Sequence, residues 1–204
     1  MPKTFTKKEK KIIRNTLIQK GSELFSKYGL KKTSITELTN AAGIAQGTFY
    51  NFYNSKEELY FEILELEEAN SEQDLEEILK SSTTAKEALR KIIKGTFKFF
   101  ESNQFIRRIY DSKDYELMVR KLPPEKLENH QMSDTLRVLN IIKRMQQKNE
   151  LIKTRPEVIS GLLRAIIILY FHQDEIGKDV FPEVTDLLAD IVADGLVNEK
   201  NIEE

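Results

Sequence analysis

Apolar residues recur every three or four positions along most of the chain, which is the spacing of helices with one buried face. The first such run is Ile13, Leu17, Leu24, Phe25 and Tyr28. Gly29 follows this run, and glycine often ends a helix because it tolerates positive φ. No segment alternates apolar and polar residues over a useful length, as a half-buried strand would. The pattern predicts an all-α fold.

Capping residues and prolines predict where the later helices begin. Ser34 and Glu37 form a capping box, which starts a second helix at Ile35. A third, short helix is expected from Gln46 to Phe52. Further helix starts are predicted at Ser55 with Glu58, Thr84 with Glu87, Pro123-Pro124, Pro156 and Pro182. The breaks between them are expected at 81–84, Asn103, 111–114, Asn149 and around Gly177.

The segment from Ala41 to Tyr53 is the most informative part of the chain. A short helix ends at Gly43, and a second short helix carries hydroxyl, amide and aromatic side chains. A glycine that turns the corner between two short helices is typical of a helix-turn-helix. In that motif the second helix lies in the major groove of DNA. The segment therefore predicts DNA binding.

Charge is distributed unevenly along the chain. Residues 1–60 hold 11 Lys and Arg against 5 Asp and Glu, whereas the whole chain has a net charge of −1. A basic end on a nearly neutral chain favours a polyanion as the partner of that end. A solvated charged face is the alternative, and the coincidence with the helix-turn-helix pattern favours DNA.

Composition excludes several other classes of protein. The chain has no cysteine, so it has no disulfide or thiolate site, which fits a reducing cytoplasm. We expect no metal site, because the two histidines lie far apart in the sequence. The apolar run 165–171 is too short to span a bilayer, and we expect a soluble protein with no membrane partner. No phosphate-cradling loop or nucleophile motif suggests an enzyme, and no cofactor is expected.

The N-terminal residues resemble the TetR/AcrR family of bacterial transcriptional regulators. The resemblance rests on Ile12, 29–38, 41–44, 47–50 and 55–59. It implies a helix-turn-helix domain over residues 1–54 and a helical ligand-binding and dimerisation domain over residues 55–204. One departure is Ala45, which stands where the family usually has a serine or similar cap; alanine is a poor N-cap.

The resemblance and the side-chain chemistry together indicate the residues that meet DNA. We expect contacts from Thr33, Ser34, Thr36, Gln46, Gly47, Thr48, Tyr50, Asn51 and Lys56. Gln46 can pair with adenine, and the N-terminus at Ser34 suits a phosphate. Tyr50 is either a phosphate contact or a core aromatic, and Phe49 is the expected core residue beside Tyr53. Lys56 is a cation at a helix start, which favours an external phosphate as its partner.

The remainder of the chain offers an apolar surface and an aromatic cluster. In the family the last two helices form a four-helix bundle with a second subunit, so we expect a homodimer through Leu162, Ile166, Tyr170, Leu188 and Ile191. Part of this surface is alternatively a monomer core. A small-molecule effector is expected near Phe97, Phe100, Phe105, Ile109 and Tyr110, although such residues are more often plain core.

Two functions remain open from the sequence. The first is a dimeric repressor that a small, mostly apolar effector releases from a palindromic operator. The second is an architectural or localisation protein that uses the same DNA-binding fold without an effector. They differ in whether a small molecule weakens DNA binding.

Overall fold

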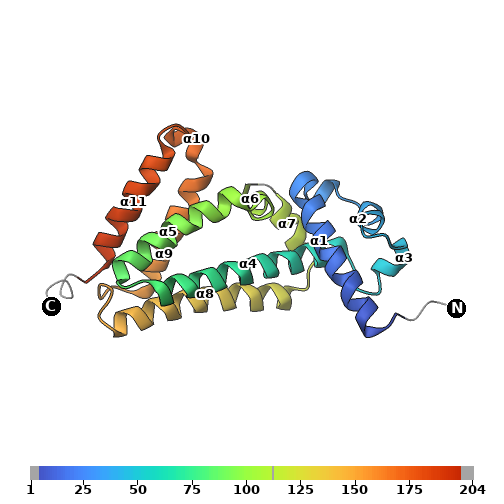
Figure 1. The fold of residues 1–204 in the computed structure, drawn as a ribbon, viewed down its shortest axis with the longest axis horizontal. Coiled ribbons are helices and arrows are strands. Elements are labelled where there is room, and N and C mark those ends of the chain that lie inside the picture. The colour runs from blue at the N-terminus through green and yellow to red at the C-terminus, as the bar shows by residue number, and fades with distance from the viewer. Residues whose placement is uncertain (1–4, 112, 199–204) are drawn as a thin grey trace. The chain divides into compact units, whose positions relative to one another are not determined.

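The computed structural model describes residues 5–111 and 113–198 and confirms the all-α fold (Figure 1). Its helices are α1 Lys7–Lys32, α2 Ile35–Ala41, α3 Gln46–Phe49, α4 Lys56–Ser81, α5 Ala85–Ser102, α6 Gln104–Asp111, α7 Asp114–Val119, α8 Pro124–Gln147, α9 Pro156–Phe171, α10 Gln173–Ile176 and α11 Phe181–Leu196. Within the described residues, strand-type pairing is limited to an isolated bridge between Leu151 and Val197. No described helix is both long and apolar enough to cross a membrane.

The helices form two compact units that do not follow chain order. The N-terminal unit comprises Met1–Asn70 and Asn103–Pro124, and the C-terminal unit comprises Ser71–Ser102 and Glu125–Glu204. Helices α6 and α7 therefore pack on α1 in the N-terminal unit, although α5 of the other unit precedes them in the sequence. The functional division at residue 54 stays a prediction.

The core of the N-terminal unit joins α1, α4 and α6. The Tyr60 ring lies 5.0 Å from Phe25 of α1 and 4.7 Å from Phe105 of α6, measured between ring centroids. A Cβ atom at Gly21 would lie 3.0 Å from Ile63 Cδ1, so the glycine lets α1 and α4 approach closely. These buried side chains provide the apolar contacts that stabilise the packing of α1, α4 and α6.

Capping boxes begin the first two helices, and the second of them was predicted from the sequence. Thr6 with Glu9 and Ser34 with Glu37 both form complete capping boxes. Gly29 has φ 81° and interrupts the helical backbone, as its position after the apolar run indicates. The last three residues assigned to α1 therefore follow a kink rather than continue a straight helix.

One predicted helix end is wrong, and the predicted helix starts after Ser55 and Thr84 are confirmed. α3 ends at Phe49 rather than Phe52, because the following amides of Asn51 and Phe52 bond three residues back in tight turns. α4 begins directly after Ser55, whose hydroxyl accepts from the Glu58 amide, and the Glu58 carboxylate accepts from the Asn54 amide. α5 begins directly after Thr84, whose hydroxyl accepts from the Glu87 amide, and the Glu87 carboxylate accepts from the Thr83 amide.

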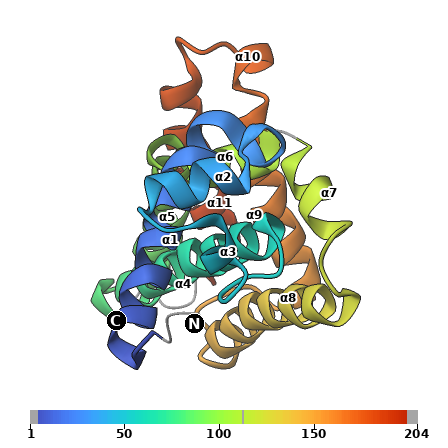
Figure 2. The same cartoon turned by 90° about the vertical axis from the view of Figure 1, so that its right-hand side faces the viewer.

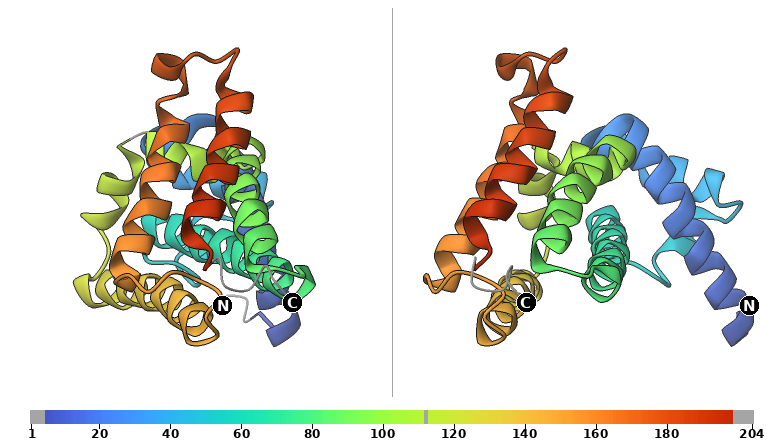
Figure 3. Two further views of the ribbon diagram at one scale, coloured as in Figure 1. Left: turned by 90° about the vertical axis from the view of Figure 1, so that its left-hand side faces the viewer. Right: turned by 60° about the vertical axis from the view of Figure 1, so that its left-hand side comes forward.

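The C-terminal unit is built on contacts of α5 with α9 and α11 (Figure 3). Phe100 stacks on Tyr170 at 5.3 Å, and Phe97 meets the Phe181 ring edge-on at 5.9 Å. Cations of α5 face aspartates of α11 at matching helical spacing. The pairs are Lys86 with Asp194, Arg90 with Asp190, and Lys94 with Asp186. The order of the pairs fixes α5 and α11 as antiparallel neighbours.

Candidate nucleic-acid interface

Helices α2 and α3 are joined by a tight turn centred on Gly43 (Figure 2). Gly43 has φ 68°, a backbone conformation that favours glycine. Its amide bonds Asn40 O at 3.2 Å, and the Ile44 amide bonds Thr39 O at 3.0 Å. These bonds close the end of α2, so the turn has a defined geometry.

Buried side chains anchor the two short helices from beneath. Leu38 of α2 and Phe49 of α3 are fully buried, and the Phe49 ring lies 5.6 Å from Tyr53. Burial raises the pKa of the Tyr53 hydroxyl, with the nearby Glu62 carboxylate as a further cause. The prediction that Phe49 is a core residue paired with Tyr53 is confirmed.

The opposite face of α2 and α3 exposes most of the predicted DNA contacts. Thr36, Gln46, Gly47, Tyr50 and Asn51 are exposed, and Thr48 is half-buried. Tyr50 keeps 54% of its surface accessible, so the alternative of a core aromatic does not apply to it. A large exposed aromatic with a terminal hydroxyl is available to a partner. The structure thus gathers six of the nine predicted residues on one short segment.

Ser34 caps α2 and remains at the surface. Its Oγ accepts from the Glu37 amide at 3.2 Å, and the Glu37 carboxylate accepts from the Ser34 amide and Oγ at 2.8 and 2.7 Å. The hydrogen bonds from the Ser34 backbone and hydroxyl lower the pKa of Glu37. The cap is therefore structural in the free protein, and a phosphate contact at this helix start stays a prediction.

Gly47 is a glycine that the fold does not require. Its φ is not positive, and no described atom lies within 4 Å of the position of an ideal Cβ. Glycine inside a helix costs roughly 0.5–1 kcal/mol relative to alanine. The free space lies at the surface of α3, where the absence of a side chain would let a partner approach the backbone closely.

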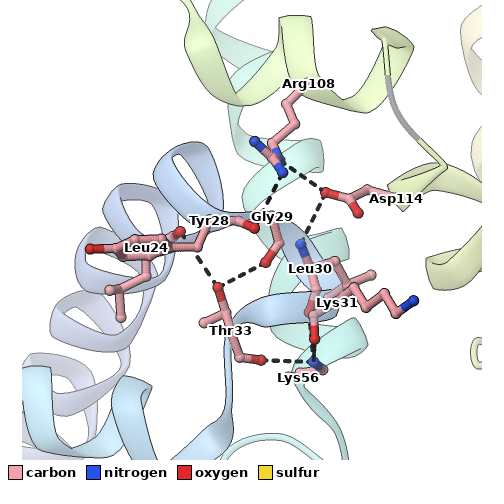
Figure 4. Close-up of polar contacts among 9 residues, drawn as sticks. All are labelled: Leu24, Tyr28, Gly29, Leu30, Lys31, Thr33, Lys56, Arg108 and Asp114. Carbon is pink, nitrogen blue, oxygen red and sulfur yellow. Dashed lines mark hydrogen bonds and ion pairs between the residues drawn. The ribbon is translucent and has the colours of Figure 1, made fainter.

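Thr33 and Lys56 have structural partners that the sequence analysis did not foresee (Figure 4). Thr33 is 1% exposed, and its hydroxyl donates to Gly29 O at 2.8 Å. Lys56 Nζ donates to Leu30 O at 2.5 Å, to Thr33 O at 2.7 Å and to Lys31 O at 3.4 Å. An ammonium has three hydrogens to donate, so these carbonyls occupy Lys56. Both side chains thus bind backbone carbonyls at the end of α1, and their contact with DNA stays a prediction.

Several exposed lysines of the N-terminal unit are absent from the predicted set. Lys31 and Lys32 are exposed directly before α2, and the first turns of α1 expose Lys7, Lys8, Lys10 and Lys11. Their signal in the sequence was the excess of basic residues within 1–60. Because phosphates attract any accessible cation, these exposed lysines are further candidates for phosphate contacts, but composition alone did not single them out.

The predicted effector residues fall into two groups. Phe97 and Phe100 are buried in the C-terminal unit, whereas Phe105 and Ile109 are buried in the N-terminal unit. Tyr110 is 58% exposed. Neither unit therefore gathers all five residues, and their role toward an effector stays a prediction.

The predicted dimer residues are also divided, in this case by burial. Ile166 and Tyr170 are 3% and 2% exposed within the single chain, because their side of α9 packs against α5. For these two residues the alternative of a monomer core describes the structure. Leu162 and Ile191 are exposed and Leu188 is half-buried. Leu187, which the prediction omitted, is 62% exposed.

Among the described residues, no group of three or more His, Asp or Glu side chains could hold a metal ion.

Comparison with known proteins places the helix-turn-helix in a family. Residues 17–63 match the model of bacterial regulatory proteins of the tetR family. The chain is 35% identical over 89 residues to the transcriptional regulator AcrR of Shigella flexneri, covering 43% of this chain and 41% of AcrR. It is 26% identical over 102 residues to the transcriptional activator FasR of Mycolicibacterium smegmatis, covering 50% and 47%. The chain thus matches less than half the length of either relative.

The fold similarity extends over nearly the whole chain. The fatty acid degradation regulator FadR of Bacillus halodurans superposes with a TM-score of 0.67 at 12% identity, covering 94% of this chain and 95% of FadR. At this identity the likeness concerns the fold. The matched relatives are named as transcriptional regulators, in agreement with the expectation of a regulator rather than an enzyme.

Proposed function

This chain belongs to the TetR/AcrR family by its N-terminal helices and its fold, and we propose that it is a dimeric transcriptional regulator whose DNA affinity a small molecule controls. The observation that carries the proposal is the face of α2 and α3. This face exposes Thr36, Gln46, Tyr50 and Asn51, while Leu38 and its neighbours anchor the helices from the opposite side.

The chemistry of this face suits both parts of DNA recognition. Gln46 and Asn51 carry amides that can pair with base edges, and the Thr36 hydroxyl can donate or accept. The lysines of α1 and the Tyr50 hydroxyl suit phosphates. Phosphate contacts would position the protein, and the amides would select the sequence.

A second copy of the chain is the proposed partner of α9 and α11. Exposed apolar residues occupy one stripe on each helix: Val158, Leu162 and Leu169 on α9, and Val184, Leu187 and Ile191 on α11. Gly161 and Gly195 have no described atom within 4 Å of an ideal Cβ, so a neighbouring helix could approach closely. A two-fold dimer would present two reading helices to half-sites about one helical turn apart.

Control by an effector is the remaining part of the proposal. α4 runs without interruption from Lys56 to Ser81 and contributes residues to both units, so it can act as a rigid lever. A mostly apolar molecule bound near Phe97 and Phe100 would shift the position of this lever. FadR is named a regulator of fatty acid degradation, which accords with an apolar effector. We propose that the chain represses transcription, whereas the relative FasR is named a transcriptional activator.

Selection from a pool of random DNA duplexes tests DNA binding. The full chain is incubated with the pool at low and moderate salt, and the retained duplexes are sequenced over several rounds. We expect an inverted repeat whose half-sites lie about one helical turn apart. Recovery of unrelated sequences with no shared motif would contradict sequence-specific regulation.

Calorimetry separates the regulator from an architectural protein. Apolar compounds that raise the melting temperature are titrated into the protein with and without the selected duplex. Coupling of about 5- to 150-fold between the two ligands is typical of allosteric proteins, and it must be reciprocal. Equal affinities in the two titrations would favour the architectural alternative.

A further inference from the structure

The end of α1 is held by side chains from three other helices of the N-terminal unit (Figure 4). Lys56 of α4 binds its carbonyls, as described above. Arg108 of α6 and Asp114 of α7 approach the same turn, 80 and 84 residues after their partners in the chain. We call Arg108, Asp114 and the backbone of Tyr28–Leu30 the α1 clasp.

Arg108 lies directly over the glycine of this turn. Its Nη2 donates to Tyr28 O at 3.2 Å. A Cβ on Gly29 would lie 2.5 Å from the same Nη2 and 2.6 Å from Nε, so a side chain at residue 29 would displace the guanidinium. Gly29 therefore serves two needs, its positive φ and the space for Arg108.

Asp114 connects the guanidinium to the next residue of α1. Its Oδ2 accepts from the Leu30 amide at 2.9 Å and from Arg108 Nε at 3.3 Å. Asp114 is 5% exposed, and a buried carboxylate is unfavourable unless it is paired and hydrogen-bonded. The residues of the clasp are therefore interdependent, since removal of Arg108 would remove a cation that is bonded to this buried carboxylate.

The clasp lies immediately before the predicted DNA-reading helices. The Thr33 amide and hydroxyl both bond Gly29 O, at 3.2 and 2.8 Å. Ser34 follows at once and caps α2. A change in the backbone of Tyr28–Leu30 would thus change the direction of α2, because the Thr33 hydrogen bonds and the Ser34 cap connect the two segments.

We propose that Arg108 and Asp114 are positioning residues for DNA binding. They fix the turn between α1 and α2, and with it the angle at which the α2–α3 face meets the groove. Neither side chain touches DNA in this proposal. The inference rests on the proposed DNA-binding function and adds that α6 and α7 set the geometry of the reading helices.

The test compares DNA affinity among variants of the full chain. Fluorescence anisotropy with the duplex recovered by selection measures Arg108→Ala, Arg108→Lys and Asp114→Asn at a temperature where each is fully folded. Arg120→Ala is the matched control, because Arg120 lies just after α7 and pairs with Glu116 at 3.9 Å between exposed side chains. We expect Arg108→Ala and Asp114→Asn to weaken binding by about 5- to 150-fold, the usual range for coupled sites. We expect Arg108→Lys to recover part of the loss and the control to match the wild type.

Hydrogen exchange gives an independent structural readout. The Leu30 amide is bonded to Asp114, so the peptide spanning 28–33 should exchange faster in Arg108→Ala and Asp114→Asn than in the wild type. Faster exchange together with weaker DNA binding supports the proposal. Unchanged DNA affinity in these folded variants overturns it, whether or not exchange accelerates.

A double-mutant cycle checks that the two residues act as a unit. The variant that combines Arg108→Ala with Asp114→Asn should bind DNA about as well as either single variant, because each change already opens the clasp. Losses that multiply would overturn the idea of a single positioning device. If the wild type itself binds no selected duplex, the proposed function has failed, and that result is distinct from failure of the clasp.

Discussion

At the scale of single residues, Gly29 and Gly47 lack a side chain for different reasons. Gly29 has φ 81° and lies beneath Arg108, so the fold requires glycine there. Gly47 has ordinary helical geometry and open space around it. The fold therefore accounts for the glycine at position 29 but not for the one at position 47, for which we propose a role in DNA binding.

Replacement of each glycine by alanine should give opposite results. Gly47→Ala should leave the free energy of unfolding unchanged or raise it by up to about 1 kcal/mol, yet weaken DNA binding because the new methyl group faces the groove. Gly29→Ala, the matched variant, should lower the free energy of unfolding by about 1–3 kcal/mol, because φ 81° and ψ 168° are strained for any other residue. Urea unfolding and anisotropy measure the two effects. Normal DNA affinity in Gly47→Ala would show that α3 does not approach DNA closely at this point.

Lys56 offers a test between a structural and a phosphate-binding role. Its ammonium binds backbone carbonyls of Leu30, Lys31 and Thr33, so Lys56→Met should destabilise the protein by about 1–3 kcal/mol, the cost of leaving such groups unpaired. Because the ammonium is already occupied, the salt dependence of DNA binding should stay the same. A lost phosphate contact would instead reduce the slope of log K against log salt by about 0.9, which would restore the original prediction.

At the scale of elements, the sequence predicted features that depend on neighbouring residues better than it predicted contacts between distant residues. The Ser34–Glu37 capping box and the Gly43 turn depend on residues within one helical turn, and both are present. The partners of Lys56 lie 23 to 26 residues away, so its spacing in the sequence could not indicate them. The sequence left a monomer core and a dimer contact open for Ile166 for a related reason, since an apolar helix shows that it is buried but not against which neighbour.

The start of α5 provides a prediction about pH. The salt bridge to Lys91 and the hydrogen bonds from Thr83 lower the pKa of Glu87 from 4.5 to about 2. A depressed pKa means that the carboxylate stabilises the fold above pH 4.5 and that this contribution is lost as the pH falls toward 2. Glu87→Gln should therefore melt at a lower temperature than the wild type at neutral pH. The difference should vanish near pH 2, and a difference that persists there would exclude the carboxylate as its cause.

At the scale of the whole molecule, the proposed dimer depends on the exposed stripe of α9 and α11. Leu187 and Ile191 are 62% and 59% exposed, so charges there should not disturb the fold of the single chain. Leu187→Glu with Ile191→Glu should give a monomer in sedimentation, because unpaired charges are costly in a buried apolar contact. Its affinity for the inverted repeat should fall, since the second half-site no longer adds to binding. A variant that remains a dimer would place the contact on another surface.

The central claim is that the exposed face of α2 and α3 reads DNA sequence. The most direct measurement repeats the duplex selection with the variant that combines Thr36→Ala and Gln46→Ala, both exposed positions. We predict altered base preferences at particular positions of each half-site and an affinity for the wild-type duplex lower by about 10- to 100-fold, since a good base contact contributes about 1–3 kcal/mol. Recovery of the same sequence with the same affinity would contradict the assignment of this face as the reading surface.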